Sequence, residues 1–216
     1  MNVDALEPGD QRTTGRAIVV VGVSSVGKTS VSEQLQLQLR EPYLHVGLDH
    51  FFSMFPYEWR DHPRGPGPGF WVERSVDADG GPRARVRYGD AGARLMAGMR
   101  VAVNALLATG NDVILDEMPV DDSIVPAWRR DLRASSVLWV RLTASLPVLE
   151  ERERGRTRGQ QIGNARGHLD VDVGDRWDLV VDTDHLTPSR TAARIVAALG
   201  LAGPPASAGG ATVDLR

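Results

Sequence analysis

The pattern of apolar and polar residues predicts strands and helices in alternation along most of the chain. Short apolar runs, typical of strands buried on both faces, lie at 17–21, 43–49, 112–117, 136–142 and 179–182. Segments with apolar residues at helical spacing separate these runs, at 28–40, 91–109, 123–133, 146–153 and 189–199. The alternation predicts an α/β fold with a doubly wound parallel sheet of about five strands and helices on both faces.

The stretch over 56–90 breaks this alternation. It contains closely spaced prolines and glycines at 63–69, which exclude a helix or an interior strand there. Beyond them, 70–76 and 84–88 have the composition of two strands around an Asp-Ala-Asp-Gly-Gly turn at 77–81. We therefore expect a hairpin flap, which either faces a substrate or only covers the core.

Both ends of the chain lack apolar periodicity. We expect a flexible N-terminus over 1–16 and a disordered tail over 203–216, which is rich in Gly, Pro, Ala and Ser. The residues between them, 17–202, are expected to form one domain with a lid at about 152–168, since 216 residues suffice for one α/β core.

A glycine-rich loop follows the first predicted strand and leads into the first predicted helix. Its sequence, Gly-Val-Ser-Ser-Val-Gly-Lys-Thr at 22–29, matches a phosphate-binding loop in the required strand–loop–helix context. Successive backbone N–H groups and the helix N-terminus attract phosphate oxygens. The candidate nucleotide-binding residues are Gly22, Val23, Ser24, Ser25, Val26, Gly27, Lys28 and Thr29.

Two side chains of this loop carry specific chemistry. Lys28 is expected to reach the β- and γ-phosphates, and Thr29 to bind Mg²⁺ through its hydroxyl. Lys28 is also the only lysine in the chain, although arginine is frequent. An Asn-Lys-x-Asp signature for guanine is therefore absent, which favours ATP over GTP as the nucleotide.

Acidic residues end two of the predicted strands. Asp116 closes the third apolar run and is the candidate Mg²⁺ ligand, directly or through water, unless it is only an exposed acidic strand end. Glu117 follows it and could orient a nucleophile, contact substrate or be solvated. Asp49 ends the second run and is the candidate base that aligns and deprotonates an acceptor hydroxyl; the alternative is a helix N-cap.

An arginine run forms the candidate lid. Arg154 and Arg158 lie four residues apart, so on a helix they would share a face and could neutralise the transferring phosphoryl group. The alternative is a solvated helix paired with neighbouring glutamates. Glycines 155 and 159 interrupt the run and favour a mobile lid.

Composition narrows the class of protein. The net charge of −3 does not indicate nucleic acid or an anionic membrane as a partner. Cysteine is absent, which excludes disulfides and thiol catalysis, and the five histidines show no zinc-ligand spacing. With no signal peptide or membrane-length apolar run, we expect a cytoplasmic enzyme.

These features together resemble the chloramphenicol phosphotransferases, bacterial P-loop kinases that phosphorylate the primary hydroxyl of that antibiotic. The likeness extends over about residues 17–199. It rests on the loop at 22–29, Val-Gly-Leu-Asp at 46–49, the turn at 77–81, the acidic pair at 116–117, Leu-Trp-Val at 138–140, the lid arginines and Val-Asp-Thr at 181–183.

The resemblance implies that Asp49 takes the acceptor proton, that Lys28 and the lid arginines hold the phosphates, and that Thr29 binds Mg²⁺. The chain departs from the family pattern at 63–69 and at Glu117, so the acceptor stays open, and after Gly159, which concerns only the detail of the lid. We expect an ATP- and Mg²⁺-dependent O-phosphotransferase acting on a small-molecule hydroxyl, with a chloramphenicol-like or nucleoside antibiotic as the first candidate. The alternatives are a housekeeping metabolite kinase and a nucleotide-binding regulator with slow ATP hydrolysis; the oligomeric state is open.

Overall fold

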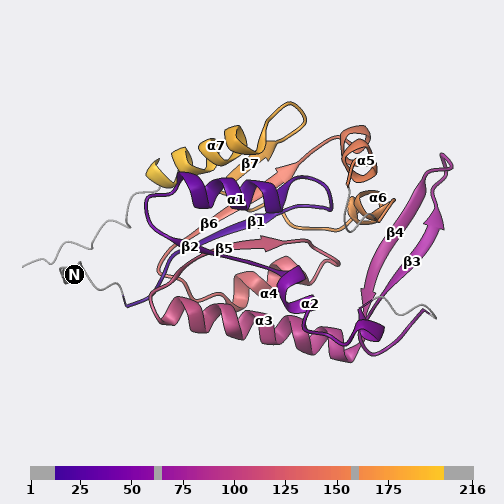
Figure 1. Cartoon of the computed structure of the whole chain (residues 1–216), viewed down its shortest axis with the longest axis horizontal. Helices are drawn as coiled ribbons and strands as arrows, with labels where there is room; N and C mark the ends of the chain where they lie inside the picture. Colours follow the sequence, from indigo (N-terminus) through magenta and orange to yellow (C-terminus); the bar gives the residue numbers. More distant parts are fainter. Residues whose placement is uncertain (1–12, 61–64, 157–160, 202–216) are drawn as a thin grey trace, which may run out of the picture.

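A computed structural model describes residues 13–60, 65–156 and 161–201. It contains a five-stranded parallel sheet in the order β2-β5-β1-β6-β7 and a separate two-stranded hairpin (Figure 1). The strands of the sheet are β1 (Ala17–Val21), β2 (Tyr43–Gly47), β5 (Asp112–Glu117), β6 (Val137–Thr143) and β7 (Leu179–Asp182). The predicted doubly wound parallel sheet is confirmed.

Helices cover both faces of the sheet. One face carries α1 (Lys28–Gln38) and α7 (Pro188–Leu201), and the opposite face carries α3 (Asp90–Ala108) and α4 (Ile124–Asp131) (Figure 1). The shorter helices α2 (Leu48–Phe52), η1 (Tyr57–Trp59), α5 (Leu146–Arg154) and α6 (Asn164–His168) lie in the connections. Of the helices in the described part of the chain, none is long and apolar enough to span a membrane.

The central strand explains the continuous apolar pattern. Ile18 and Val20 pack into a cluster with Leu35 of α1, whereas Val19 packs on the other side with Met99 of α3. Every residue of β1 is buried because both faces of the sheet are covered.

The second strand ends earlier than the apolar pattern predicts. β2 stops at Gly47, and Asp49 lies in the first turn of α2 rather than at the end of a strand. The Gly47 N–H donates to His50 Nδ1 at 3.0 Å, which turns the chain into the helix. The helix cap is Gly47, so the alternative reading of Asp49 as the N-cap is wrong.

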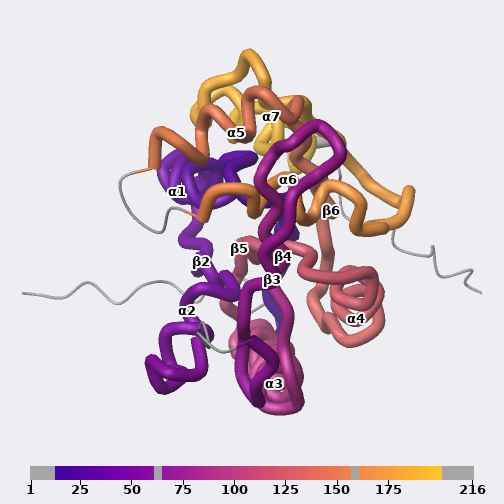
Figure 2. The backbone as a smooth tube through the Cα atoms, turned by 90° about the vertical axis from the view of Figure 1, so that its right-hand side faces the viewer, coloured from indigo at the N-terminus to yellow at the C-terminus, as the bar shows by residue number. Residues whose placement is uncertain are grey.

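The predicted hairpin is present as β3 (Phe70–Val76) and β4 (Pro82–Tyr88), which pair antiparallel. It stands beyond the carboxyl ends of the sheet strands, with α6 beside β4 (Figure 2). The contact is intimate, because a Cβ at Gly167 of α6 would lie 1.9 Å from the carbonyl oxygen of Ala84. Only glycine lets α6 approach the strand this closely.

Several predictions fall outside the described ranges. Most of the flexible segment predicted over 1–16 and all of the tail predicted over 203–216 lie there, as does Arg158. Within the first of these segments, Gly15 N donates to Leu107 O and Arg16 N donates to Asp112 Oδ1. The predicted division into one domain with terminal extensions stays a prediction.

The approach of α6 to β4 generates a stability test. Gly167→Ala would force a methyl group against a backbone carbonyl, so we expect a loss of about 1–3 kcal/mol in the free energy of unfolding, measured in urea. The control is Gly98→Ala in α3, where an added Cβ meets no atom within 4 Å. There the higher helix propensity of alanine should stabilise by up to about 1 kcal/mol. Equal effects at the two glycines would contradict the proposed close packing.

Candidate active site

Parallel pairing brings three strand ends to one edge of the sheet. In the register, Val21 of β1 lies beside Glu117 of β5, and Gly47 of β2 lies beside Asp116. The glycine-rich loop after β1, the acidic pair that ends β5 and the helix that carries Asp49 after β2 therefore meet at this edge. Ligands of doubly wound sheets gather at such carboxyl ends.

The glycine-rich loop has the backbone of a phosphate-binding loop. Gly27 adopts a left-handed conformation, with φ of 102°, and is the residue before the first turn of α1. Ser24, Ser25 and Lys28 are buried in the loop. The N-terminus of α1, with its unpaired backbone N–H groups, thus opens into the loop and can attract an anion.

Lys28 is held among oxygen atoms. Its ammonium donates to the carbonyl of Val23 at 3.1 Å and lies 3.9 Å from Asp116 Oδ1. Burial lowers the pKa of Lys28, and the carboxylates of Asp116, Asp49 and Glu117 oppose this shift. All three predicted acidic residues are thus close enough to act on the same ammonium.

Asp116 and Thr29 contact each other directly. The Thr29 hydroxyl donates to Asp116 Oδ2 at 2.8 Å, and His45 Nε2 lies 3.5 Å from the same oxygen. Burial raises the pKa of Asp116, but the His45 ring, the Lys28 ammonium and the Thr29 hydroxyl outweigh it and hold this pKa below its usual range. The Asp116 side chain is only 11% exposed, so the alternative of a solvated acidic strand end is wrong.

The pair has the chemistry of a Mg²⁺ site that a nucleotide completes. A hydroxyl and an ionised carboxylate are hard oxygen donors, and Mg²⁺ is usually held by one or two such groups together with phosphate oxygens and water. No group of three or more His, Asp or Glu side chains that could hold a metal occurs within the described ranges. The donors present therefore fit a nucleotide-bound Mg²⁺ better than an ion held by protein alone.

Glu117 is sealed beneath the site. Its side chain accepts a hydrogen bond from Trp128 Nε1 of α4, and the residue is only 4% exposed. Burial raises the pKa of Glu117 to about 7, although the Trp128 donor favours the ionised form. The alternative that Glu117 is solvated is wrong.

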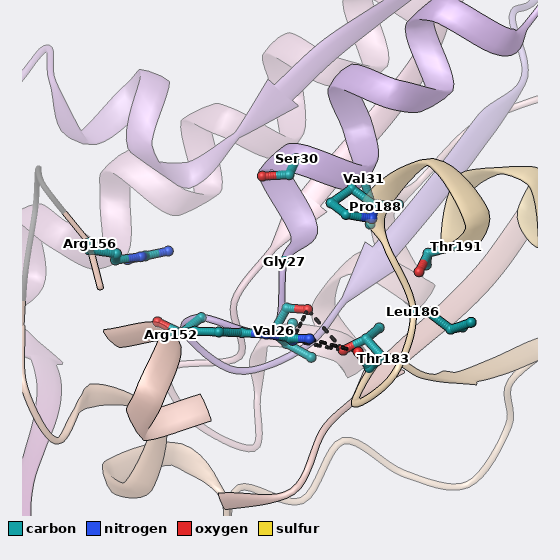
Figure 3. Close-up of a pocket in the computed structure, with 11 residues that line it drawn as sticks. Val26, Gly27, Ser30, Val31, Arg152, Arg156, Thr183, Leu186, Pro188 and Thr191 are labelled. Carbon is teal, nitrogen blue, oxygen red and sulfur yellow. Dashed lines mark hydrogen bonds between the residues drawn. The ribbon is translucent and has the colours of Figure 1, made fainter. Parts of the chain in front are cut away.

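A cavity of about 260 Å³ adjoins the glycine-rich loop. Its walls come from the loop and α1, the end of α5, and the segment that runs from the end of β7 into the first turn of α7 (Figure 3). The lining residues are Ser25, Val26, Gly27, Ser30, Val31, Arg152, Arg156, Thr183, Leu186, Pro188 and Thr191. The mixture of apolar side chains, hydroxyls and arginines suits a flat heterocycle attached to an anionic group.

Arg152 ties the cavity walls together. It donates to the hydroxyl of Thr183 at 3.0 Å and to the Thr183 carbonyl at 2.7 Å, and it approaches the Val26 carbonyl at 3.4 Å (Figure 3). Arg156, four residues later, also lines the cavity and acts electrostatically to lower the pKa of Lys28.

The helix that carries the first arginine of the predicted pair ends at that arginine. α5 ends at Arg154 with Gly155 as its cap, so the helical face on which Arg154 and Arg158 were to meet does not extend to residue 158. Arg154 is exposed and is not among the residues that line the cavity. Arg158 lies outside the described residues, and the roles predicted for both stay predictions.

A model of the chloramphenicol phosphotransferase-like proteins matches residues 15–200. The chain belongs to the chloramphenicol phosphotransferase-like family. The resemblance inferred from the motifs is thus confirmed, and with it the enzyme class, a phosphotransferase.

The names of two related proteins agree with the phosphotransferase class. Two Mycobacterium tuberculosis proteins, from strains CDC 1551 / Oshkosh and ATCC 25618 / H37Rv, each carry the name "Putative O-phosphotransferase". Each is 29% identical over 192 residues, which cover 83% of this chain and 80% of the relative.

Solved structures share the fold at low identity. A sugar kinase from Janibacter sp. HTCC2649 has a TM-score of 0.59 at 16% identity, over 87% of this chain and 96% of its own. The Mycobacterium tuberculosis APS kinase in complex with AMPPNP and APS has a TM-score of 0.57 at 14% identity, over 88% and 99%. A gluconokinase from Sinorhizobium meliloti 1021 has a TM-score of 0.57 at 20% identity, over 88% and 94%. The fold is that of the P-loop kinases.

Sequence reasoning missed several residues of this family member's site. Arg152 and Arg156 have the same four-residue spacing as Arg154 and Arg158, so spacing could not separate the two pairs. His45 could have been found, because it is two residues from Gly47 on the same face of a strand that ends at the site. Trp128 carried no signal, since only the packing of α4 brings it to Glu117.

The Glu117–Trp128 contact leads to a pH-dependent expectation. Folding raises the pKa of Glu117 from 4.5 to about 7. The folded protein therefore loses stability as the pH rises from the pKa that Glu117 has in the unfolded chain through the pKa that it has in the folded protein. Trp128→Phe removes a donor that lowers the Glu117 pKa, so this loss should extend to higher pH. We expect the substitution to cost about 1–3 kcal/mol more in the free energy of unfolding at pH 8 than at pH 6, measured in urea.

The matched control is Trp177→Phe. Trp177 Nε1 donates to the backbone carbonyl of Gly174 at 2.9 Å, an acceptor that does not titrate. Its cost should therefore be the same at both pH values. A Trp128→Phe cost that is equally independent of pH would contradict the role assigned to this hydrogen bond.

Proposed function

We propose that this protein transfers the γ-phosphoryl group of ATP to a hydroxyl of a small molecule, and that the acceptor is an antibiotic of the chloramphenicol-like or nucleoside class. The observation that carries the proposal is the convergence of Lys28, the Thr29–Asp116 pair and Asp49 at one edge of the sheet. Phosphoryl transfer needs a cationic phosphate cradle, a metal site and an aligned acceptor side by side.

The nucleotide would bind across the glycine-rich loop. Its phosphates would meet the N-terminus of α1 and the Lys28 ammonium, and its base would enter the cavity lined by Arg152 and Thr183. Arg156, which also lines this cavity and acts electrostatically on Lys28, would add positive charge near the transferring group. Arg154 and Arg158 remain proposed lid residues.

Thr29 and Asp116 would hold the Mg²⁺ that accompanies the nucleotide. A bound Mg²⁺ compensates the negative charge of the phosphates. The protein's own contribution is orientation, because the hydrogen bond from the Thr29 hydroxyl to Asp116 Oδ2 places the two oxygen donors side by side.

Asp49 would act on the acceptor. It lies in the first turn of α2, is exposed, and is close enough to Lys28 to oppose the effect of burial on that ammonium. From there its carboxylate can accept the proton of a hydroxyl and hold the oxygen in line with the phosphoryl group. The hairpin β3–β4, which stands beyond the same edge, would cover the acceptor.

The burial of Glu117 bears on the alternative of a slow ATP-hydrolysing regulator. A hydrolysing regulator has to activate water, and the acidic pair of Asp116 and Glu117 is the feature of the sequence that favours this alternative. The Glu117 carboxyl accepts from Trp128 and is only 4% exposed, which leaves it poorly suited to hold a nucleophilic water. Transfer to an acceptor is the better supported chemistry, and a metabolite kinase would differ from it only in the acceptor.

The acceptor can be tested directly. ADP release from Mg-ATP is measured with and without chloramphenicol, nucleoside antibiotics, sugars and gluconate, and products are weighed by mass spectrometry. We expect acceptor-dependent ADP release and a product heavier by one phosphate with an antibiotic. A product only with a sugar or gluconate would instead support the metabolite kinase, and release that ignores every acceptor would support the regulator.

The proposed base is tested by Asp49→Asn. This variant keeps the shape of the side chain but cannot accept the proton, so kcat should fall about 10²–10⁴-fold. The affinity for AMPPNP, measured by calorimetry, should stay nearly unchanged. Glu33→Gln, an exposed carboxylate on α1, is the control and should keep wild-type turnover. Near-normal turnover of Asp49→Asn would exclude it as the base.

The arginine that faces the nucleotide cavity is tested by Arg156→Ala. Removing this charge should raise the KM for ATP and lower kcat/KM about tenfold or more, because charge-assisted contacts to phosphate are among the stronger ones. Arg194→Ala, an exposed arginine on α7, is the matched control. If the two variants had the same KM for ATP, Arg156 would not contact the nucleotide.

A further inference from the structure

The edge of the hairpin is joined to α6 through the backbone. The outward N–H of Ala84 donates to Gly163 O at 2.9 Å, and that of Val86 donates to His168 Nε2 at 3.2 Å. His168 is buried, and its Nδ1 lies 2.8 Å from the carbonyl of Asn164 in the same helix. α6 therefore takes the place of a third strand beside β4.

Arg166 links the same two elements through charge. Its Nη1 donates to Asp79 Oδ1 and Oδ2 at 2.8 and 2.7 Å and to Asp77 Oδ2 at 3.3 Å, all in the hairpin turn. Its Nε donates to Glu150 Oε1 of α5 at 2.8 Å. The Arg166 side chain is only 10% exposed, so one guanidinium bridges α5, α6 and the hairpin away from most solvent.

α5 and α6 are also joined beneath this bridge. The carboxylate of Glu153 accepts from the backbone N–H groups of Gly163 at 2.9 Å and of Ala165 at 2.6 Å. Glu153 is 1% exposed, so these bonds are formed in a dry environment and hold the first turn of α6 to α5. Arg152 precedes Glu153 in α5, and Arg156 lies just beyond the end of this helix. Both arginines line the cavity proposed for the nucleotide.

The base of the hairpin reaches the acceptor side. Phe70 of β3 packs against Phe52 and Phe55, with ring centroids 5.2 and 5.9 Å apart, and Phe52 belongs to the helix that carries Asp49. Tyr88 at the end of β4 donates to Asp121, which follows the acidic pair. A continuous series of contacts thus runs from the nucleotide cavity to the helix of the proposed base.

We propose that α5, α6 and the β3–β4 hairpin form a single cover over both substrates, and that Arg166 is the positioning residue that makes nucleotide binding also set the position of the hairpin. This inference rests on the proposed function. Without the link through Arg166, the hairpin would close on the acceptor independently of the nucleotide. With it, binding at the cavity lined by Arg152 prepares the acceptor side before the acceptor arrives.

The absence of cysteine from the sequence permits a direct test with spin labels. One label pair, Leu37→Cys with Val76→Cys, reports the hairpin relative to α1, since these side chains are 76% and 69% exposed. A second pair, Leu37→Cys with Glu151→Cys, reports α5. Distances are measured by electron–electron double resonance in the full chain, with and without AMPPNP and Mg²⁺, and AMPPNP binding is measured by calorimetry.

We expect AMPPNP to shift both distances in the otherwise unchanged protein. In the Arg166→Ala background the α5 pair should still shift, whereas the hairpin pair should lose its response. A merely structural defect would not separate the two pairs. Arg74→Ala, an exposed arginine on β3, is the control and should keep both responses. If Arg166→Ala does not fold, Asp79→Asn weakens the same link from the exposed hairpin turn.

Any other outcome would overturn one part of the proposal. An α5 response without a hairpin response in the unchanged protein would show that the cover is not one unit. A hairpin response that survives both Arg166→Ala and Asp79→Asn would remove the role of Arg166. Bound AMPPNP with no response from either pair would exclude nucleotide-driven positioning while leaving the kinase proposal intact. No AMPPNP binding at all would reject the proposed function together with this inference.

Discussion

A lysine ammonium buried at the edge of a sheet is the interaction on which this structure depends. An ammonium removed from water is costly unless oxygen atoms replace the lost solvent. At Lys28 those atoms are the Val23 carbonyl and the Asp116 carboxylate, with Asp49 and Glu117 adding negative charge nearby. Lys28 begins α1 and Asp116 is the last residue but one of β5, so their pairing needs β1 and β5 in the observed parallel register. The strand register and the charge balance at Lys28 therefore depend on each other.

The same balance explains why the site suits an anionic ligand with a metal. Asp116 lies 3.9 Å from the buried Lys28 ammonium, and Asp49 and Glu117 act on the same ammonium electrostatically. Burial raises the pKa of Glu117 to about 7, so near neutral pH Glu117 is partly protonated. Asp116 keeps its charge because His45, Thr29 and Lys28 all stabilise the ionised form. The site thus presents the ionised carboxylate of Asp116 beside the Lys28 ammonium. The Glu117 carboxyl is instead bound by Trp128 and kept away from solvent.

Local patterns predicted the sheet and the phosphate loop because both are encoded in short segments. An apolar run followed by Gly-x-x-x-x-Gly-Lys-Thr already specifies a strand, a loop and a helix. Asp49 was placed near the correct edge but in the wrong element, since nothing in the run shows that Gly47 turns the chain toward His50. The cavity arginines, Arg152 and Arg156, could not be chosen from the sequence, because Arg154 and Arg158 have the same four-residue spacing.

The short helix α6 was not predicted at all, and its contacts explain why. It has only five residues, and one of them is Gly167, so its intrinsic helix propensity is weak. Its stability comes from residues distant in sequence, the Glu153 carboxylate and the open edge of β4. An open strand edge needs a partner, and here α6 supplies it. Moving α6 away from β4 would leave the Ala84 and Val86 N–H groups without acceptors and would separate the Arg166 guanidinium from Asp77 and Asp79, while its bond to Glu150 of α5 would remain. Displacement of α6 and the hairpin together therefore costs less free energy than displacement of either alone.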